Sequence, residues 1–130
     1  MKIALDTNAY TDWKKGVRWQ REIPEGDEVH ISTTVLGELY YGFACGGKQR
    51  KNLEELELFL ENSCVRVDLV TKEVAACYGD LKKYLRERGT PIPENDIWIS
   101  AACVEQGCTL LTSDKHFECL PQVRVQWTEV

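Results

Sequence analysis

The sequence has no apolar run that approaches the roughly 20 residues needed for a transmembrane helix. Its first residues reach the charged Asp6 too soon for the long apolar region of a secretory signal. These two absences exclude the common membrane-anchored and secreted classes. We therefore expect a soluble, cytoplasmic protein without a membrane partner.

Paired metal-binding cysteines are also missing. The six cysteines contain no Cys-x-x-Cys pair, and only His30 and His116 could complete a zinc site with them. Structural zinc sites normally use short paired spacings. Cys77 lies beside Val74 and Leu81 in one apolar stripe. We therefore expect most cysteines to be small buried hydrophobic residues of a reducing compartment.

The composition is that of one globular domain. The chain has 130 residues, of which 43% are hydrophobic and 28% are charged, so a disordered chain is excluded. We expect one domain over residues 1–130. The net charge of −5 argues against a nucleic-acid partner, unless the acidic residues are gathered at a site.

Short apolar segments alternate with segments of helical periodicity. The predicted strands are 2–5, 29–31, 65–69, 109–112 and 123–127, and the main predicted helices begin near residues 7, 33, 48, 71 and 95. Residues 17–28 are polar and irregular. Alternation of this kind is typical of an α/β domain, in which a parallel sheet is covered by helices on both faces.

Four acidic residues occupy positions where such a fold would gather them. Asp6 follows the first strand and Asp114 the fourth, while Asp96 begins the helix that leads to the fourth strand. Glu38 flanks the apolar stripe of its helix. Ligands of open α/β sheets bind beyond the carboxyl ends of the strands, so we expect these four side chains to converge there. Each acid alone could instead cap a helix or favour its dipole.

Convergence of carboxylates needs a cation. Two carboxylates about 4 Å apart repel by roughly 4 kcal/mol at an effective dielectric constant near 20. A site of carboxylates and waters, without thiolate or imidazole, suits Mg²⁺, with Mn²⁺ as a substitute. Such a site can activate water and hold the oxygens of a phosphodiester. Without these four acids the net charge is −1, which no longer argues against RNA.

Four sequence segments together resemble a known family. They are Asp6-Thr-Asn8 after the first strand, Ser32-Thr-Thr-Val-Leu-Gly-Glu38-Leu, Pro93-Glu-Asn95-Asp96-Ile-Trp-Ile-Ser-Ala-Ala102, and Leu110-Leu-Thr112-Ser113-Asp114. In this order and spacing they resemble the PIN-domain ribonucleases, and within them the VapC-type toxins of prokaryotic toxin–antitoxin pairs. The resemblance runs from the first residue to about Val125.

The resemblance implies a five-stranded parallel sheet in the order 3-2-1-4-5 and a Mg²⁺-dependent endoribonuclease. Asp6 and Asp96 would be the principal metal ligands, and Glu38 and Asp114 would complete the site. Five flanking residues would orient these ligands by hydrogen bonding: Thr7, Asn8, Asn95, Thr112 and Ser113. The resemblance further implies a structured RNA substrate (tRNA or rRNA), a cognate antitoxin and a homodimer.

A basic segment with aromatic residues follows the first acid. Lys14, Lys15, Arg18 and Arg21 surround Trp13 and Trp19, and they could grip phosphates while an indole stacks on a base. The alternative interpretation is a solvated helix end that two tryptophans anchor in the core or at a dimer contact.

Other functions remain open at this point. The chain could be a solitary PIN-domain RNA-processing nuclease or a catalytically inactive PIN-like binding module. A receiver-like signalling module would use Asp68 as phosphate acceptor, but it leaves Glu38 unexplained. A dehalogenase-like phosphatase would need aspartate at position 8, where the sequence has Asn8.

Overall fold

The computed structural model describes residues 1–128, which form a five-stranded sheet with helices on both faces. The strands are β1 (Lys2–Leu5), β2 (Glu28–Ser32), β3 (Val65–Asp68), β4 (Thr109–Thr112) and β5 (Val125–Trp127). Their order is β3-β2-β1-β4-β5, and every neighbouring pair is parallel. The predicted fold class and strand order are therefore confirmed.

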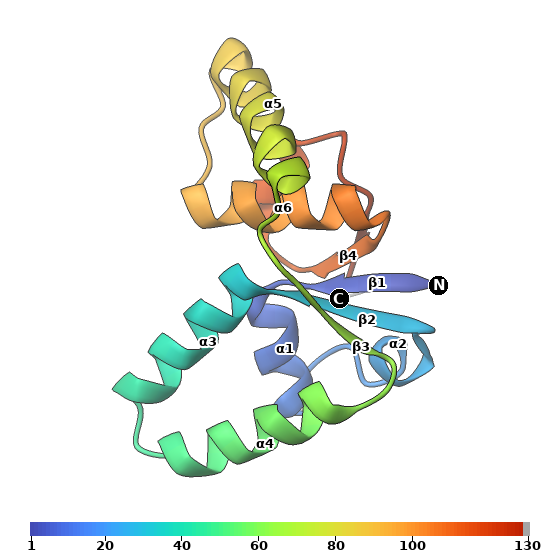
Figure 1. Ribbon diagram of the computed structural model, residues 1–130, viewed down its shortest axis with the longest axis vertical. Coiled ribbons are helices and arrows are strands. Elements are labelled where there is room, and N and C mark those ends of the chain that lie inside the picture. The colour runs from blue at the N-terminus through green and yellow to red at the C-terminus, as the bar shows by residue number, and fades with distance from the viewer. Residues whose placement is uncertain (129–130) are drawn as a thin grey trace.

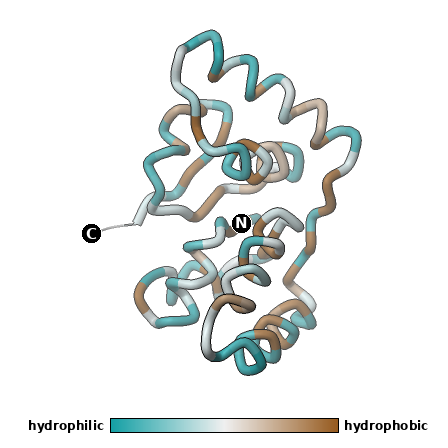
Figure 2. Tube along the Cα trace, turned by 90° about the vertical axis from the view of Figure 1, so that its left-hand side faces the viewer, coloured by the Kyte–Doolittle hydropathy of each residue, from teal (hydrophilic) through white to brown (hydrophobic). Residues whose placement is uncertain are grey.

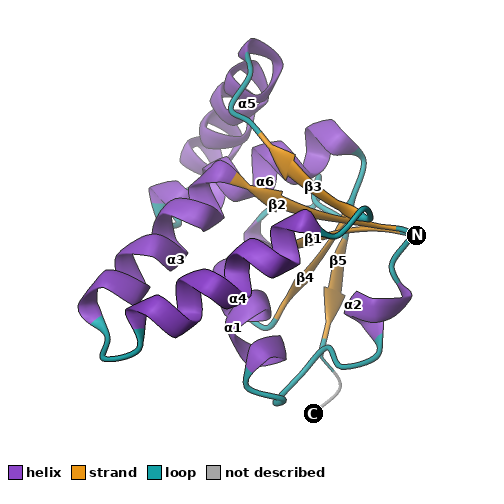
Figure 3. Cartoon of the chain, turned by 60° about the horizontal axis from the view of Figure 1, so that its bottom comes forward, coloured by secondary structure: helices purple, strands orange, loops and turns teal. Residues whose placement is uncertain are grey.

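The helices divide between the two faces of the sheet (Figure 1). One face carries α1 (Thr7–Lys14), α3 (Thr33–Cys45) and α4 (Gln49–Glu61), and the other carries α5 (Lys72–Arg88) and α6 (Glu94–Gln106). A short helix α2 (Glu22–Glu25) and a 3₁₀ turn η1 (Lys115–Cys119) complete the elements. Figure 3 shows the sheet between these two groups of helices, with β5 at the edge opposite β3.

Local signals in the sequence explain where the helices begin and end. The hydroxyls of Ser32 and Thr71 accept hydrogen bonds from the backbone amides of α3 and α5, as capping residues do. Gly89 ends α5 with φ near 69°, a left-handed conformation that glycine adopts without steric cost. The α2 helix was not predicted, because four residues are too few to show helical periodicity.

The cysteine prediction is correct for only part of the set. Cys103 and Cys108 are buried in the core, and Cys77 and Cys119 are partly buried, but Cys45 and Cys64 are exposed. Cys45 ends α3 and Cys64 precedes β3, so both lie at element ends that face solvent. All six thiols are free.

The core lies between the sheet and the apolar faces of the helices. Hydrophobic and hydrophilic residues alternate along the helical turns, as Figure 2 shows, because each helix buries one side only. Among residues 1–128, no helix is both long and apolar enough to cross a membrane.

The strand order creates a crevice at the centre of the sheet. From β1 the chain proceeds to β2 and β3 on one side, and later to β4 and β5 on the other. The connections that follow β1 and β4 leave these neighbouring strands in opposite directions, which opens a crevice beyond the carboxyl ends of the two strands. The fold therefore positions a ligand site next to the residues that follow these two strands.

Candidate metal centre

A cavity of about 520 Å³ lies at this point of the fold. Its lining contains all four predicted acids, residues near them on α1 and around the start of α6, and a histidine: Asp6, Thr7, Asn8, Glu38, Pro93, Glu94, Asn95, Asp96, Ile99, Asp114 and His116. Four separate segments of the chain thus bring their carboxylates to one cavity. Their role as metal ligands stays a prediction.

Asp6 is the most enclosed of the acids, with 5% of its surface exposed. Its Oδ1 accepts a 2.7 Å hydrogen bond from the amide of Ala9, so it also caps α1. The pKa of Asp6 is raised to about 6, chiefly by burial; the hydrogen bonds that Asp6 accepts oppose this rise, and the charges of Asp114 and Asp96 add to it. Asp6 therefore caps α1 and lines the cavity at the same time, and its role as a metal ligand stays a prediction.

Thr112 connects the ends of two neighbouring strands. Its buried hydroxyl donates to Oδ2 of Asp6 and accepts a 2.9 Å hydrogen bond from the backbone amide of Asp114. One hydroxyl thereby fixes the Asp6 carboxylate and the start of the segment that carries Asp114. The predicted role of Thr112 is to orient a metal ligand by such a hydrogen bond, and it stays a prediction.

Glu38 reaches the cavity from α3 and is held by α1. The hydroxyl of Thr7 donates a 2.6 Å hydrogen bond to Oε1 of Glu38. The carboxylate is partly buried, and Oε2 is left for a further ligand. Thr7 therefore fixes one oxygen of Glu38, and its role in orienting a metal ligand stays a prediction.

The remaining two acids meet a histidine. Nδ1 of His116 lies 2.9 Å from Oδ2 of Asp96 and 3.2 Å from Oδ1 of Asp114. Burial raises the pKa of Asp96, and the charges of Asp114 and Glu38 add to this effect, while the His116 hydrogen bond lowers it. His116 thus adds an imidazole to a cavity lining for which the sequence predicts carboxylate ligands alone.

Two lining residues, His116 and Glu94, were not among the predicted metal ligands and supporting residues. His116 follows Asp114 by two residues, a spacing that a 3₁₀ turn brings to one side. Glu94 lies in the same first turn of α6 as Asp96, and it accepts hydrogen bonds from the Tyr78 hydroxyl and the Lys82 ammonium. In both cases the available signal was proximity to a predicted acid.

The predicted RNA-binding segment lies outside the cavity lining. Trp13 packs against Tyr10 and Phe59, and Trp19 is buried, so the alternative interpretation of the two indoles is correct. The cations are exposed, and Arg18 lies 3.1 Å from Asp12. Contact between RNA and Lys14, Lys15, Arg18 and Arg21 stays a prediction.

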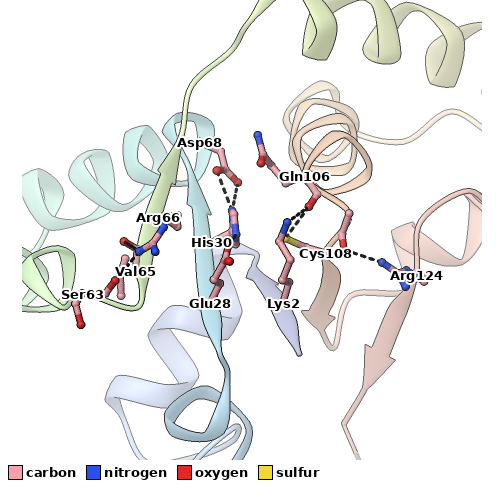
Figure 4. A network of polar contacts seen from close by, with 11 residues as sticks. Lys2, Glu28, His30, Ser63, Val65, Arg66, Asp68, Gln106, Cys108 and Arg124 are labelled. Carbon is pink, nitrogen blue, oxygen red and sulfur yellow. Dashed lines mark hydrogen bonds and ion pairs between the residues drawn. The ribbon is translucent and has the colours of Figure 1, made fainter.

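Two further predicted residues lie away from the cavity. Ser113 is exposed and is absent from the cavity lining within residues 1–128, and its orienting role stays a prediction. Asp68 is buried and is held by His30, with 2.9 Å between Nδ1 and both carboxylate oxygens (Figure 4). This pairing removes the reason to consider Asp68 as a phosphate acceptor.

The donor set fits a divalent cation. Carboxylate oxygens are the preferred ligands of Mg²⁺ and Mn²⁺, and one imidazole nitrogen is compatible with the latter. The ligand atoms of Asp96, Asp114 and His116 all lie within 4.8 Å of one another. Burial, and to a smaller extent the charges of the neighbouring acids, raises the pKa of Asp6 and of Asp96, and a bound cation would offset both effects.

Comparisons with known proteins agree with this architecture. Residues 3–122 match the PIN domain family. The chain is 31% identical to Ribonuclease VapC2 of Haemophilus influenzae over 74% of this chain and 72% of that protein. It is 28% identical to Ribonuclease VapC2 of Rickettsia felis, over 78% and 75% of the two chains. A crystal structure of DNA-bound VapBC from Salmonella typhimurium superposes with a TM-score of 0.84 at 26% identity, covering 97% of both chains. The chain therefore belongs to the PIN-domain family, and within it is similar to the VapC ribonucleases.

Proposed function

We propose that the chain is a Mg²⁺-dependent endoribonuclease and the toxin of a toxin–antitoxin pair. The observation that carries the proposal is the cavity at the ends of β1 and β4, where acids from four separate segments meet. The similarity to proteins named Ribonuclease VapC supports RNA as the substrate. Mn²⁺ would substitute for Mg²⁺.

The chain's own residues would hold the ion and orient the substrate. Asp6 and Asp96 would be the principal ligands, with Glu38 and Asp114 beside them. The bound ion supplies a Lewis acid that activates water and stabilises charge on the phosphodiester. Thr7 and Thr112 keep two of these carboxylates in fixed orientations through their hydroxyls. A site fixed in this way needs little reorganisation during the reaction.

The rim of the cavity offers neutral donors to a phosphate. Asn8 and Asn95 are exposed on opposite sides of the lining, one on α1 and one on α6. Their amide groups can donate hydrogen bonds to the oxygens of an RNA backbone. The expected orienting role of both residues thus extends to the substrate.

A cognate antitoxin completes the proposal. DNA-bound VapBC of Salmonella typhimurium contains a chain of the same fold, and VapBC is a family of toxin–antitoxin systems. Five carboxylates line the cavity of the present chain. An antitoxin arginine could pair with two of them and exclude the metal, while α3 and α4 provide the neighbouring surface. We also propose a homodimer. The test uses the complex of this chain with the protein encoded by the neighbouring gene. Replacing one arginine of that partner by alanine should restore RNA cleavage while the two proteins stay bound to each other.

The test is a cleavage assay on structured RNA with a Mg²⁺ titration. Asp6→Asn should reduce cleavage by more than about 100-fold without altering the circular dichroism spectrum, because it removes a metal ligand and keeps the volume. Asp80→Asn, at an exposed position on α5, is the matched control. Wild-type protein without metal-dependent cleavage would instead indicate an inactive binding module.

A solitary RNA-processing nuclease is the second candidate. It would cleave by the same residues but would have no inhibitory partner. The neighbouring reading frame distinguishes the two, because a toxin requires a small co-encoded antitoxin. Failure of every neighbour-encoded protein to inhibit cleavage would favour the solitary nuclease.

A further inference from the structure

His116 is a residue of the cavity for which the proposed four-acid centre has no role. Its ring lies beside Asp96 and Asp114, and it lines the same cavity as Asp6 and Glu38. The nitrogen that faces the carboxylates is Nδ1. This directed contact between one ring nitrogen and two carboxylates distinguishes His116 from a surface side chain without polar partners.

The backbone fixes this orientation. Asp114 caps η1, because its Oδ1 accepts a 3.0 Å hydrogen bond from the backbone amide of His116. The next residue, Phe117, is almost fully buried and anchors η1 in the core. The Cα of His116 is therefore held at the edge of the cavity by one polar contact and one apolar contact.

The distances match those between neighbouring ligands of one ion. Bonds of about 2.1 Å at right angles, as in an octahedral shell, separate adjacent ligand atoms by about 3 Å. Nδ1 of His116 lies 2.9 Å from the Asp96 oxygen and 3.2 Å from the Asp114 oxygen. The ring is half exposed, so Nε2 can carry the proton in water while Nδ1 offers its lone pair.

We infer that Nδ1 of His116 is a direct ligand of the metal ion, together with Asp96 and Asp114, and that it shifts the preference of the site from Mg²⁺ toward Mn²⁺. Imidazole nitrogen favours transition metals over Mg²⁺, whereas carboxylates alone do not. This inference rests on the proposed metal-dependent function and adds a nitrogen ligand to it. The alternative is that His116 only orients the two acids by a hydrogen bond.

The direct test is pulsed electron paramagnetic resonance of the Mn²⁺-loaded protein, without RNA. A coordinated imidazole should give a ¹⁴N modulation, and selective ¹⁵N-histidine labelling should replace it with a ¹⁵N modulation. Labelling requires no substitution, so the result does not depend on the folding of a variant. Bound Mn²⁺ without nitrogen coupling would overturn the inference.

Calorimetric titration with Mn²⁺ and with Mg²⁺ gives the second readout. His116→Ala should weaken Mn²⁺ binding by about 10-fold or more and Mg²⁺ binding by less than about threefold. Lys115→Ala, at the neighbouring exposed position of η1, is the matched control and should change neither affinity. An equal loss for both ions would show that His116 orients the acids and does not bind the ion.

The two proposals fail in different ways. If neither ion binds, or if Asp96→Asn binds Mn²⁺ as tightly as the wild type, the metal centre itself is wrong. If cleavage depends on a metal and on Asp96, but the nitrogen coupling is missing, only the role of His116 is wrong.

Discussion

The two histidines of this chain both lie among carboxylates, yet their surroundings differ. His30 is 3% exposed, and its two ring nitrogens contact Asp68 and Glu28 at 2.9 Å. We call Glu28, His30 and Asp68 the closed cluster. Figure 4 shows its side chains, which come from β2 and β3. The open cluster (Asp96, Asp114 and His116) is directed at the cavity.

The difference between the clusters is one of charge balance. Burial raises the pKa of Asp68, but His30 and the charge of Lys2 lower it. Burial also raises the pKa of Asp96, and there the charges of Asp114 and Glu38 add to the increase. The closed cluster satisfies its own polar atoms and can serve stability, whereas the open cluster keeps an excess of negative charge that favours a cation. The same side-chain types thus have a structural use in one place and a candidate functional use in the other.

The largest expected effect separates the two clusters by activity. Asp96→Asn should lower RNA cleavage by more than about 100-fold in saturating Mg²⁺, because a ligand is lost from the proposed centre. Asp68→Asn should change cleavage by less than about threefold at a temperature where both variants are folded, since Asp68 does not line the cavity. Initial rates on one structured RNA measure both. Similar losses in the two variants would remove the distinction between the clusters.

The second effect concerns stability, and here the larger loss is expected in the closed cluster. His30→Ala should lower the free energy of unfolding by about 3 to 5 kcal/mol, because the buried Asp68 loses its partner. His116→Ala should lower it by less than about 1 kcal/mol, since its ring is half exposed. Urea denaturation followed by circular dichroism measures both values. A larger loss from His116→Ala would show that the open cluster is the structural one.

The sequence predicts one cluster better than the other, for a physical reason. Asp114 of the open cluster comes one residue after β4, just as its neighbour in the cavity, Asp6, comes directly after β1, so a parallel sheet of known order brings both to one edge without any knowledge of side-chain packing. The pairing of His30 with Asp68 depends on the register of β2 against β3, which align Ser32 with Asp68 over a long sequence separation. No local pattern encodes this register.

His116 and Trp19 show the same limit at shorter range. The direction of the His116 ring depends on the 3₁₀ turn η1 and on the burial of Phe117, which periodicity over five residues does not reveal. Trp19 has φ near 67°, an uncommon value for a residue other than glycine, and it is buried in a segment that looked irregular. Prediction from sequence therefore located the acids that lie next to strand ends. It did not locate side chains such as those of His116 and Trp19, whose contacts depend on the conformation of a turn or an irregular segment.

The third effect is a pH dependence of the stability of the folded protein, and it arises from Asp6 in the cavity. The pKa of Asp6 rises from 3.8 to about 6 on folding. Between these values the folded protein holds a proton that the unfolded chain has lost, so stability falls as the pH rises. The loss should be about 2 to 3 kcal/mol in metal-free protein between pH 4 and pH 7. Asp6→Asn should remove most of this slope in urea denaturation, whereas Asp80→Asn should keep it. If the stability of Asp6→Asn fell with pH as steeply as that of the wild type, ionisation of Asp6 would not be the cause of the loss.

The smallest effect is the stabilisation of the folded protein by metal. An ion that binds only the folded state adds about 1.4 kcal/mol at ten times its dissociation constant, which raises the melting temperature of a domain of this size by a few degrees. Wild-type protein should show this rise in Mg²⁺ or Mn²⁺ at millimolar concentration.

Asp68→Asn should melt lower than the wild type but show the same rise, because the closed cluster needs no ion. Asp96→Asn should melt at least as high as the wild type without metal, since one repelling charge is gone, and should rise less when metal is added. Differential scanning calorimetry of the three proteins, each with and without metal, gives all the values. Equal shifts in Asp96→Asn and in the wild type would show that the carboxylates at the cavity do not share an ion.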